Sequence, residues 1–152
     1  MHVLAGATTR RSLVTELSAD LIGAYLETDY KVSGDAPFTL RVGEASPALR
    51  ERQACHAAAG SAYVTAWNPL GAKTDAVENA GANEELAAWL QEQGLAFETG
   101  IGEHPSGQWP GEASFLIHGL SLETAITLGE QVRQNAILWA GNDGVPELVL
   151  LR

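Results

Sequence analysis

The sequence predicts a single α/β domain with a mixed sheet of five or six strands and about four helices. Segments with apolar residues at helical spacing alternate along the chain with short runs that have the spacing or composition of strands. Glycine, proline, asparagine and aspartate cluster between these segments. A chain of 152 residues, of which 45% are hydrophobic and 18% charged, suits one folded domain with a substantial core.

The amino-terminal part predicts a helix after a flexible segment. Residues 12–27 carry apolar side chains at spacings of three and four, and Ser12 is the expected cap. Residues 1–11 are expected to be the flexible segment, so the domain spans residues 12–152. Residues 28–37 are interpreted as the end of the helix and a turn.

The rest of the chain predicts three more helices and six strands. Helix starts are indicated by Ser46-Pro47, Asp75 and Ser121, and helix ends by Gly60 and Gly94. The expected helices cover residues 46–60, 76–93 and the segment that begins at 121. The expected strands cover residues 38–42, 62–67, 95–101, 113–118, 136–140 and 147–151.

The connections between these elements predict both kinds of strand pairing. Two strand–helix–strand crossovers in the first two thirds of the chain favour some parallel pairing. Two strand–loop–strand links later in the chain, one with the hairpin signal of residues 141–144, favour antiparallel pairing. The strand of residues 62–67 lies between two helices, which favours a central, two-sided environment. The order of the strands is not predicted.

The composition argues against two classes of partner. Nine lysines and arginines face 19 aspartates and glutamates, which gives a formal net charge of −10. This charge disfavours binding to nucleic acid and to anionic membranes. No apolar run approaches the ~18 residues that span a bilayer. We therefore expect neither a nucleic-acid partner nor a membrane partner.

The single cysteine and the absence of known functional motifs narrow the possible compartment and the possible functions of the protein. A single cysteine, Cys55, excludes an intrachain disulfide and suits the cytoplasm. The first basic residues follow a short apolar patch, the opposite of a secretory signal. Phosphate-loop, dinucleotide and nucleophile-elbow motifs are absent from the sequence. Four scattered histidines give no metal-ligand spacing, so neither a cofactor nor a metal is predicted.

The strongest candidate site is the junction formed by residues 62–83. The strand must stop at Pro69, directly after Trp67 and Asn68. The apolar face of the next helix, followed backwards from Leu86 and Trp89, passes through two asparagines. These are Asn79 and Asn83. Ligands in open α/β sheets bind beyond strand carboxyl ends and near helix starts, so all four polar or aromatic residues are candidates. The alternative is that the asparagines bond loop backbone and fix the turn.

Three other segments add candidates. The loop of residues 102–112 holds Glu103, His104 and Glu112 and is a candidate lid, with Trp109 as a ligand contact. The alternative is a solvated loop with Trp109 packed down as its anchor. Glu112 and Glu78 are the candidate acid–base residues, Gln134 joins the ligand set, and Arg41 is either an anion contact or a solvated side chain.

Several of these residues form one pattern together with others along the chain. Its members are Tyr25, Thr28, Tyr30, Thr65 to Pro69, Glu78, Asn79, Asn83, Gly107, Trp109, Pro110, Glu112, Ser114, Phe115, Gln134 to Ala136, and Gly144 to Val149. The pattern resembles a bacterial family, the domain of unknown function 3293. The resemblance covers about residues 21–151 and implies no particular activity, cofactor or substrate.

Two functions from different classes remain open. The first is a cytosolic domain that binds a small polar or nucleotide-like ligand around Asn68, with or without catalysis by Glu112 or Glu78. It predicts a pocket in which the candidates converge, namely Trp67, Asn68, Asn79, Asn83, Trp109 and Gln134. The alternative is an acidic protein-interaction module, such as an inhibitor, an immunity-type protein or a regulator, whose charge suits a basic partner.

Overall fold

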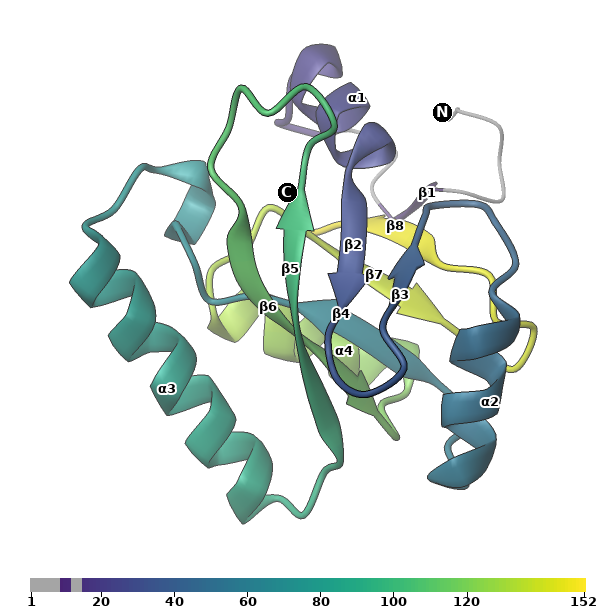
Figure 1. Ribbon diagram of the computed structural model, residues 1–152. Helices are drawn as coiled ribbons and strands as arrows, with labels where there is room; N and C mark the ends of the chain where they lie inside the picture. Colours follow the sequence, from purple (N-terminus) through teal and green to yellow (C-terminus); the bar gives the residue numbers. More distant parts are fainter. Residues whose placement is uncertain (1–8, 12–14) are drawn as a thin grey trace.

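The computed structural model describes residues 9–11 and 15–152 and contains one twisted sheet flanked by helices (Figure 1). Eight strands follow the order β1-β8-β7-β4-β6-β5-β2-β3. The strands are β1 (Thr9–Arg11), β2 (Asp29–Val32), β3 (Phe38–Leu40), β4 (Ser61–Val64), β5 (Phe97–Glu103), β6 (Glu112–His118), β7 (Ala136–Ala140) and β8 (Glu147–Leu150). The helices are α1 (Ala19–Glu27), α2 (Pro47–Cys55), α3 (Ala76–Glu92) and α4 (Leu122–Gln131), with a 3-10 turn, η2 (Pro69–Gly71).

The α/β class and the four helices are confirmed, but the sheet has more strands than predicted. Strand β2 lies in a segment whose sequence predicts a helix end and a turn. It starts one residue after the C-cap Thr28 and has four residues, too few to show a clear strand period. Pairing with β3 on one side and β5 on the other makes it a strand.

The amino-terminal predictions fall partly outside the described residues. Ser12, the expected cap, is outside them, and α1 begins instead after Ser18, whose side chain accepts a hydrogen bond from the Leu21 N–H. Within the segment expected to be flexible, Thr9–Arg11 form β1, which pairs parallel with β8. Residues 1–8 lie outside the described part.

The predicted caps of the other helices are confirmed. Ser46, Asp75 and Ser121 each accept hydrogen bonds from backbone N–H groups in the first turn of their helix. Gly94 follows the last residues of α3 with a φ of 71°. Helix α2 ends earlier than predicted, at Cys55, because Ala57 takes the left-handed conformation with a φ of 50°.

The two crossovers do not produce the expected parallel pairs. Strands β4 and β5, joined through α3, run in the same direction, but β6 lies between them and pairs antiparallel with both. Strands β3 and β4, joined through α2, are separated by β2, β5 and β6. Within the described residues, β1 with β8 is the one parallel pair. The β5–β6 and β7–β8 links are antiparallel, as predicted.

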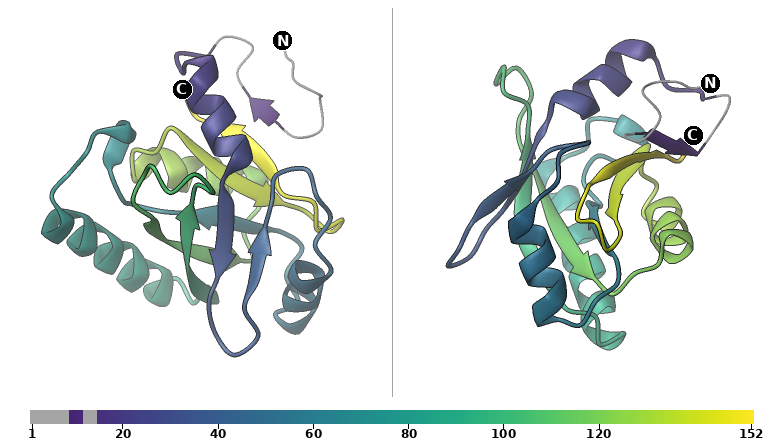
Figure 2. Two further views of the ribbon diagram at one scale, coloured as in Figure 1. Left: turned by 45° about the horizontal axis from the view of Figure 1, so that its top comes forward. Right: turned by 90° about the vertical axis from the view of Figure 1, so that its right-hand side faces the viewer.

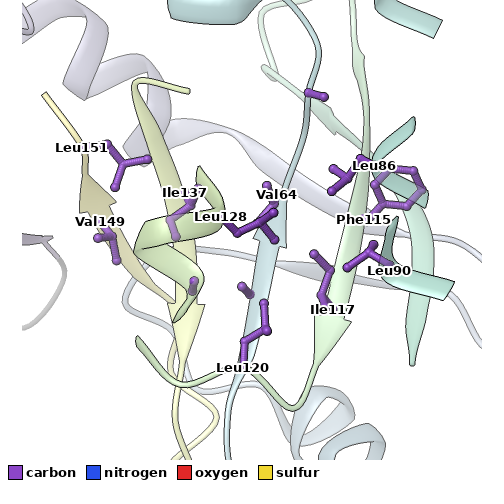
Figure 3. Close-up of a cluster of buried hydrophobic side chains, with 13 residues drawn as sticks. Val64, Leu86, Leu90, Phe115, Ile117, Leu120, Leu128, Ile137, Val149 and Leu151 are labelled. Carbon is purple, nitrogen blue, oxygen red and sulfur yellow. The ribbon is translucent and has the colours of Figure 1, made fainter. Parts of the chain in front are cut away.

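The core has two layers, one on each face of the sheet. Figure 2 shows the helices on the two faces. Helices α3 and α4 cover the first face, where Leu90 and Leu128 meet Val64 and Ile117 (Figure 3). Helices α1 and α2 cover the second face, which contains Tyr63. All four residues of β4 are buried, so the predicted central position of this strand is confirmed.

Candidate functional site

The predicted junction lies at the end of the sheet where β4 stops. Because β4 is antiparallel to both of its neighbours, its carboxyl end meets the amino ends of β6 and β7. This arrangement brings Asn68, which follows β4, close to Glu112 at the start of β6. It also brings Gln134, just before β7, to the same end.

Asn79 is bound to the loop that contains Asn68. The Asn68 backbone N–H donates to Asn79 Oδ1 at 2.8 Å, and Asn79 Nδ2 donates to Asn68 Oδ1 at 2.8 Å and to the Thr74 carbonyl at 3.1 Å. Asn79 is 2% exposed, and the hydrogen bonds engage its oxygen and its nitrogen inside the protein. Its role is to hold the loop that follows β4.

Asn83 is bound in the same way between two strands. Its Oδ1 accepts from the Ala66 N–H at 2.9 Å, and its Nδ2 donates to the Ala113 carbonyl at 2.8 Å. The β4–β6 ladder ends at the pair Val64 and Phe115, so these backbone groups lie just beyond it. These contacts favour the alternative interpretation of Asn79 and Asn83, in which the asparagines bond backbone and fix the turn. Asn83 bonds backbone groups just beyond the β4–β6 ladder, and Asn79 bonds backbone groups of the loop after β4.

At this end of the sheet, the Glu112 carboxylate has hydrogen-bond acceptor sites that the described residues leave unused. Asn68 Nδ2 donates to Glu112 Oε2 at 3.1 Å, and this is the one hydrogen bond to the carboxylate from the described residues. Burial raises the pKa of Glu112, and the bond from Asn68 opposes that rise. A half-buried carboxylate with free lone pairs favours a ligand that offers N–H or O–H donors.

Two tyrosines that were not among the predicted site residues lie near Glu112. Burial is the main cause that raises the pKa of Tyr25 and of Tyr30, and the charge of Glu112 adds to both shifts. The Tyr30 hydroxyl donates to the Tyr25 carbonyl at 2.6 Å. Both tyrosines belong to the pattern of the family resemblance, which was the one signal in the sequence that marked them.

A second chain of hydrogen bonds links the carboxyl terminus to this end. Asn135 Nδ2 donates to the Tyr25 hydroxyl at 3.3 Å, and Arg152 Nη1 donates to Asn135 Oδ1 at 2.9 Å. A Cβ atom on Gly71 would lie 2.9 Å from Asn135 Nδ2, so glycine is needed for η2 to pack here. The buried Asn135 therefore joins α1, η2 and the chain end.

The loop between β5 and β6 carries an exposed tryptophan. Trp109 is 53% exposed, so it is not the packed anchor of the alternative interpretation. The His104 ring contacts it edge-on at 4.6 Å, and His104 Nε2 lies 3.0 Å from Glu27 Oε1 at the end of α1. The loop is therefore attached to α1 and leaves the Trp109 indole facing solvent.

The remaining predicted residues lie apart or have partners within the protein. Gln134 is buried, and its Nε2 donates to the Trp67 carbonyl at 3.2 Å, which gives it a structural role. The Trp67 side chain is half-buried. Arg41 Nη1 lies 2.8 Å from Asp29 Oδ1, so the anion that it faces is part of the protein. Glu78 is exposed in the first turn of α3.

The backbone of the junction is strained. Asn68 and Leu70 have φ values of 47° and 56°, and Gly71 has a φ of 74°. Asparagine and glycine tolerate this region, but leucine does not. Such a conformation costs about 1–3 kcal/mol and persists where the surroundings enforce it. Here the Leu70 N–H donates to the Arg133 carbonyl at 2.6 Å.

A groove of about 330 Å³ lies between α3 and α4, next to the junction. Its walls are mainly apolar, with one acidic side chain from α3, one amide side chain from α4 and one basic side chain from the turn after α4. The lining residues are Ala66, Pro69, Ala82, Glu85, Leu86, Trp89, Leu128, Gln131, Val132 and Arg133. The predicted ligand residues do not line it, so the groove and the Glu112 site are separate features.

None of the helices within residues 9–11 and 15–152 combines the length and the hydropathy that a membrane span requires.

Comparison with known proteins found a match to one family model. The family model described as "Protein of unknown function (DUF3293)" matches residues 64–137 and confirms the resemblance over that segment. The match extends from the end of β4 into β7 and includes Asn68, Trp109 and Glu112. Searches of the curated proteins and of the solved structures found no match.

Proposed function

Because residues 64–137 match the DUF3293 family model, whose description assigns no activity, we propose a function from the site itself. The protein binds a small polar, nucleotide-like ligand with N–H donors at the end of the sheet where Asn68 meets Glu112. The observation that carries this proposal is the half-buried Glu112 carboxylate, which receives a single hydrogen bond, from Asn68, among the described residues.

The chemistry of a carboxylate at this depth supports a donor ligand. Desolvation weakens the competition from water, so an N–H group of a ligand bonds more strongly to such an oxygen than to an exposed one. The raised pKa of Glu112 also suits transfer of a proton to or from a bound molecule. Glu112 is therefore the acid–base residue if the site is catalytic, and Glu78 is not part of the proposal.

The aromatic and backbone features nearby fit the same role. Trp109, in the loop that leads to Glu112, exposes an indole on which a planar ligand can stack. The strained backbone at Leu70 is the kind of feature that clusters at ligand sites. Cys55 is single and exposed, which suits the reducing cytoplasm that this proposal includes.

Ligand screening by thermal shift and by NMR tests the proposal. The compounds are nucleosides, amino sugars and amino-acid amides, and the proteins are the wild type, Glu112→Gln and the control Glu84→Gln. Glu84 is exposed on α3, so its substitution changes net charge by the same amount away from the site. We expect a hit that binds the wild type and Glu84→Gln equally and Glu112→Gln about tenfold more weakly, the loss of one charged hydrogen bond. Equal binding to all three proteins, or no hit, would refute it.

A protein-interaction function is the second candidate, and the groove between α3 and α4 favours it. The apolar side chains of Trp89 and Val132 lie in the groove, while the acidic residues of α3 are exposed beside it. An apolar side chain with basic neighbours is the partner surface that fits this arrangement.

Two substitutions of alanine by arginine distinguish the protein-interaction function from the ligand-binding function. Ala82→Arg blocks the groove, and Ala88→Arg adds the same charge on an exposed position of the same helix. Affinity capture from cells, quantified by mass spectrometry, should find a partner that the wild type and Ala88→Arg retain and Ala82→Arg loses. A partner set identical for all three proteins argues against the groove.

A further inference from the structure

The opposite end of the sheet gathers two histidines and a carboxylate from three different elements. His118 ends β6, Glu98 is near the start of β5, and His56 is the C-cap of α2. One ligand atom from each residue lies within 4.8 Å of the ligand atoms of the other two. The His118 Nε2 and Glu98 Oε2 atoms are 2.8 Å apart, and the rings of His56 and His118 are stacked with centroids 4.7 Å apart.

The outer contacts of these residues resemble the supporting shell of a metal site. His118 is 2% exposed, and its Nδ1 lies 2.8 Å from Ser61 Oγ. Gln53 Nε2 in turn donates to Ser61 Oγ at 3.4 Å. Arg52 Nε lies 3.5 Å from Glu98 Oε1, which leaves Oε2 on the side of the histidines. A hydrogen bond at the second ring nitrogen and a held carboxylate are what orient metal ligands in proteins.

We propose that His56, Glu98 and His118 bind a divalent first-row transition-metal ion, with Zn²⁺ as the representative ion. Two imidazoles and one carboxylate are a ligand set for such ions, and three protein ligands leave a coordination position open. In a tetrahedral site, ligand atoms are about 3.3 Å apart, given Zn–N distances of about 2.0–2.1 Å. The His118 Nε2 and Glu98 Oε2 atoms, which are 2.8 Å apart, must therefore move slightly away from each other. The exposed His56 ring must turn towards them.

The proton balance of this binding step follows from the contacts. A carboxylate only accepts, so the 2.8 Å contact requires a hydrogen on His118 Nε2, and the Ser61 hydroxyl then donates to Nδ1. Metal binding at Nε2 takes the place of that hydrogen, so the neutral ring changes tautomer: its one N–H hydrogen leaves Nε2 and one is gained at Nδ1 by exchange with solvent, with no net release of a proton. The Ser61 oxygen then accepts from Nδ1 instead of donating to it. The metal replaces the hydrogen bond between His118 and Glu98.

This site is independent of the proposed ligand site. Strand β6 separates Glu112 from His118 by six residue steps, roughly 20 Å at strand spacing. No sequence pattern predicts this site, because its ligands are distant along the chain and show no metal-binding spacing. Pairing of β5 with β6 brings Glu98 next to His118, and pairing of β6 with β4, the strand that follows α2, brings His56 to the same place. The net charge of −10 favours a bound cation.

Zn²⁺ binding by untagged full-length protein tests the proposal. Isothermal titration and metal analysis after dialysis compare the wild type with His56→Gln and Glu98→Gln. His104→Gln is the matched control, because His104 lies in the β5–β6 loop at the other end of the sheet. We expect one equivalent of Zn²⁺ on the wild type and on His104→Gln, and binding weakened at least about tenfold in the other two variants.

A second measurement guards against a folding artefact. His56 is exposed, so His56→Gln is expected to keep the wild-type thermal unfolding temperature without metal and to lose the increase that Zn²⁺ causes in the wild type. Co²⁺ substitution should give a visible absorption band that depends on His56. The proposal is overturned if the wild type binds less than one equivalent, or if His56→Gln and His104→Gln bind Zn²⁺ with the same affinity.

Discussion

The side chain of Asn83 accepts a hydrogen bond from the backbone N–H of Ala66 at 2.9 Å, where β4 no longer pairs with β6. Its Nδ2 donates to the Ala113 carbonyl at 2.8 Å, so one amide continues the β4–β6 connection beyond the ladder. The junction is therefore closed by a helix side chain in place of another strand residue.

Asn83→Ala should destabilise the protein by about 1–3 kcal/mol, the cost of a buried donor without a partner. The donor is the N–H of Ala66, a residue that is 4% exposed. Urea unfolding measures the loss, and Glu84→Ala on the exposed side of α3 is the control. A loss equal to that of the control would show that Asn83 does not support the junction.

Glu112→Gln should change how stability depends on pH. The folded protein holds the pKa of Glu112 above its ordinary value of 4.5, so it binds this proton more tightly than the unfolded chain does. The contribution of Glu112 to stability is therefore present below the unfolded pKa and is lost as pH rises through the folded pKa. Glutamine keeps an oxygen for Asn68 but does not titrate, so the variant should lose less stability across weakly acidic pH.

Urea unfolding of both proteins from about pH 4 to about pH 7 measures this difference. If the difference between the two unfolding free energies is the same at every pH, the pKa of Glu112 is not raised in the folded protein. Glu84→Gln again controls for the change in net charge.

Gly100→Ala should be among the most damaging changes in the sheet. A Cβ atom at this position would lie 2.0 Å from the Lys31 carbonyl oxygen and 2.9 Å from the Tyr63 hydroxyl, which itself donates to that carbonyl at 2.7 Å. The expected cost is about 1–3 kcal/mol or more, because backbone must move. Thermal and urea unfolding measure it.

Gly81→Ala is the counterpart that should stabilise the protein. Gly81 lies inside α3, and a Cβ atom there meets nothing within 4 Å, so the close backbone approach that a helix glycine suggests is absent. Alanine should add up to about 1 kcal/mol through helix propensity. If Gly81→Ala and Gly100→Ala have effects of the same sign, the packing around one of them is not as described.

Ala57→Gly should stabilise the end of α2 by roughly 0.5–1 kcal/mol. Ala57 has a φ of 50°, which an L-residue with a Cβ atom adopts at a cost of about 1–2 kcal/mol, and glycine recovers part of it. Ala59→Gly is the control, because Ala59 is exposed and does not have a positive φ. A loss of stability in Ala57→Gly would contradict the left-handed conformation.

Local chemistry explains which parts of the fold could be predicted. The caps at Ser46, Asp75 and Ser121 were predictable because each side chain bonds backbone within its own first turn. Strand β2 was not, since its four residues become a strand only through partners from distant segments. The insertion of β6 between β4 and β5 likewise depends on long-range pairing that no local pattern records.

The candidate site was likewise predictable only in part. Helix phase predicted that Asn79 and Asn83 point towards the strand end, and both do contact it. The helical periodicity does not indicate which polar groups a side-chain amide will bond. The structural role of Asn79 and Asn83 was therefore visible only in the folded protein. The contact between Asn68 and Glu112 joins residues 44 positions apart and had no signal in spacing.

The central position of β4 has a consequence for synthesis on the ribosome. Both neighbours of β4 lie later in the chain, and its first residue, Ser61, pairs with His118 and with Ala140. The most buried strand must therefore remain without partners until more than half of the remaining chain has emerged. Such long-range pairing slows folding and exposes apolar strands to aggregation. We expect the nascent chain to need protection until β7 is available, and carboxyl-terminal truncations before Ala136 to be insoluble.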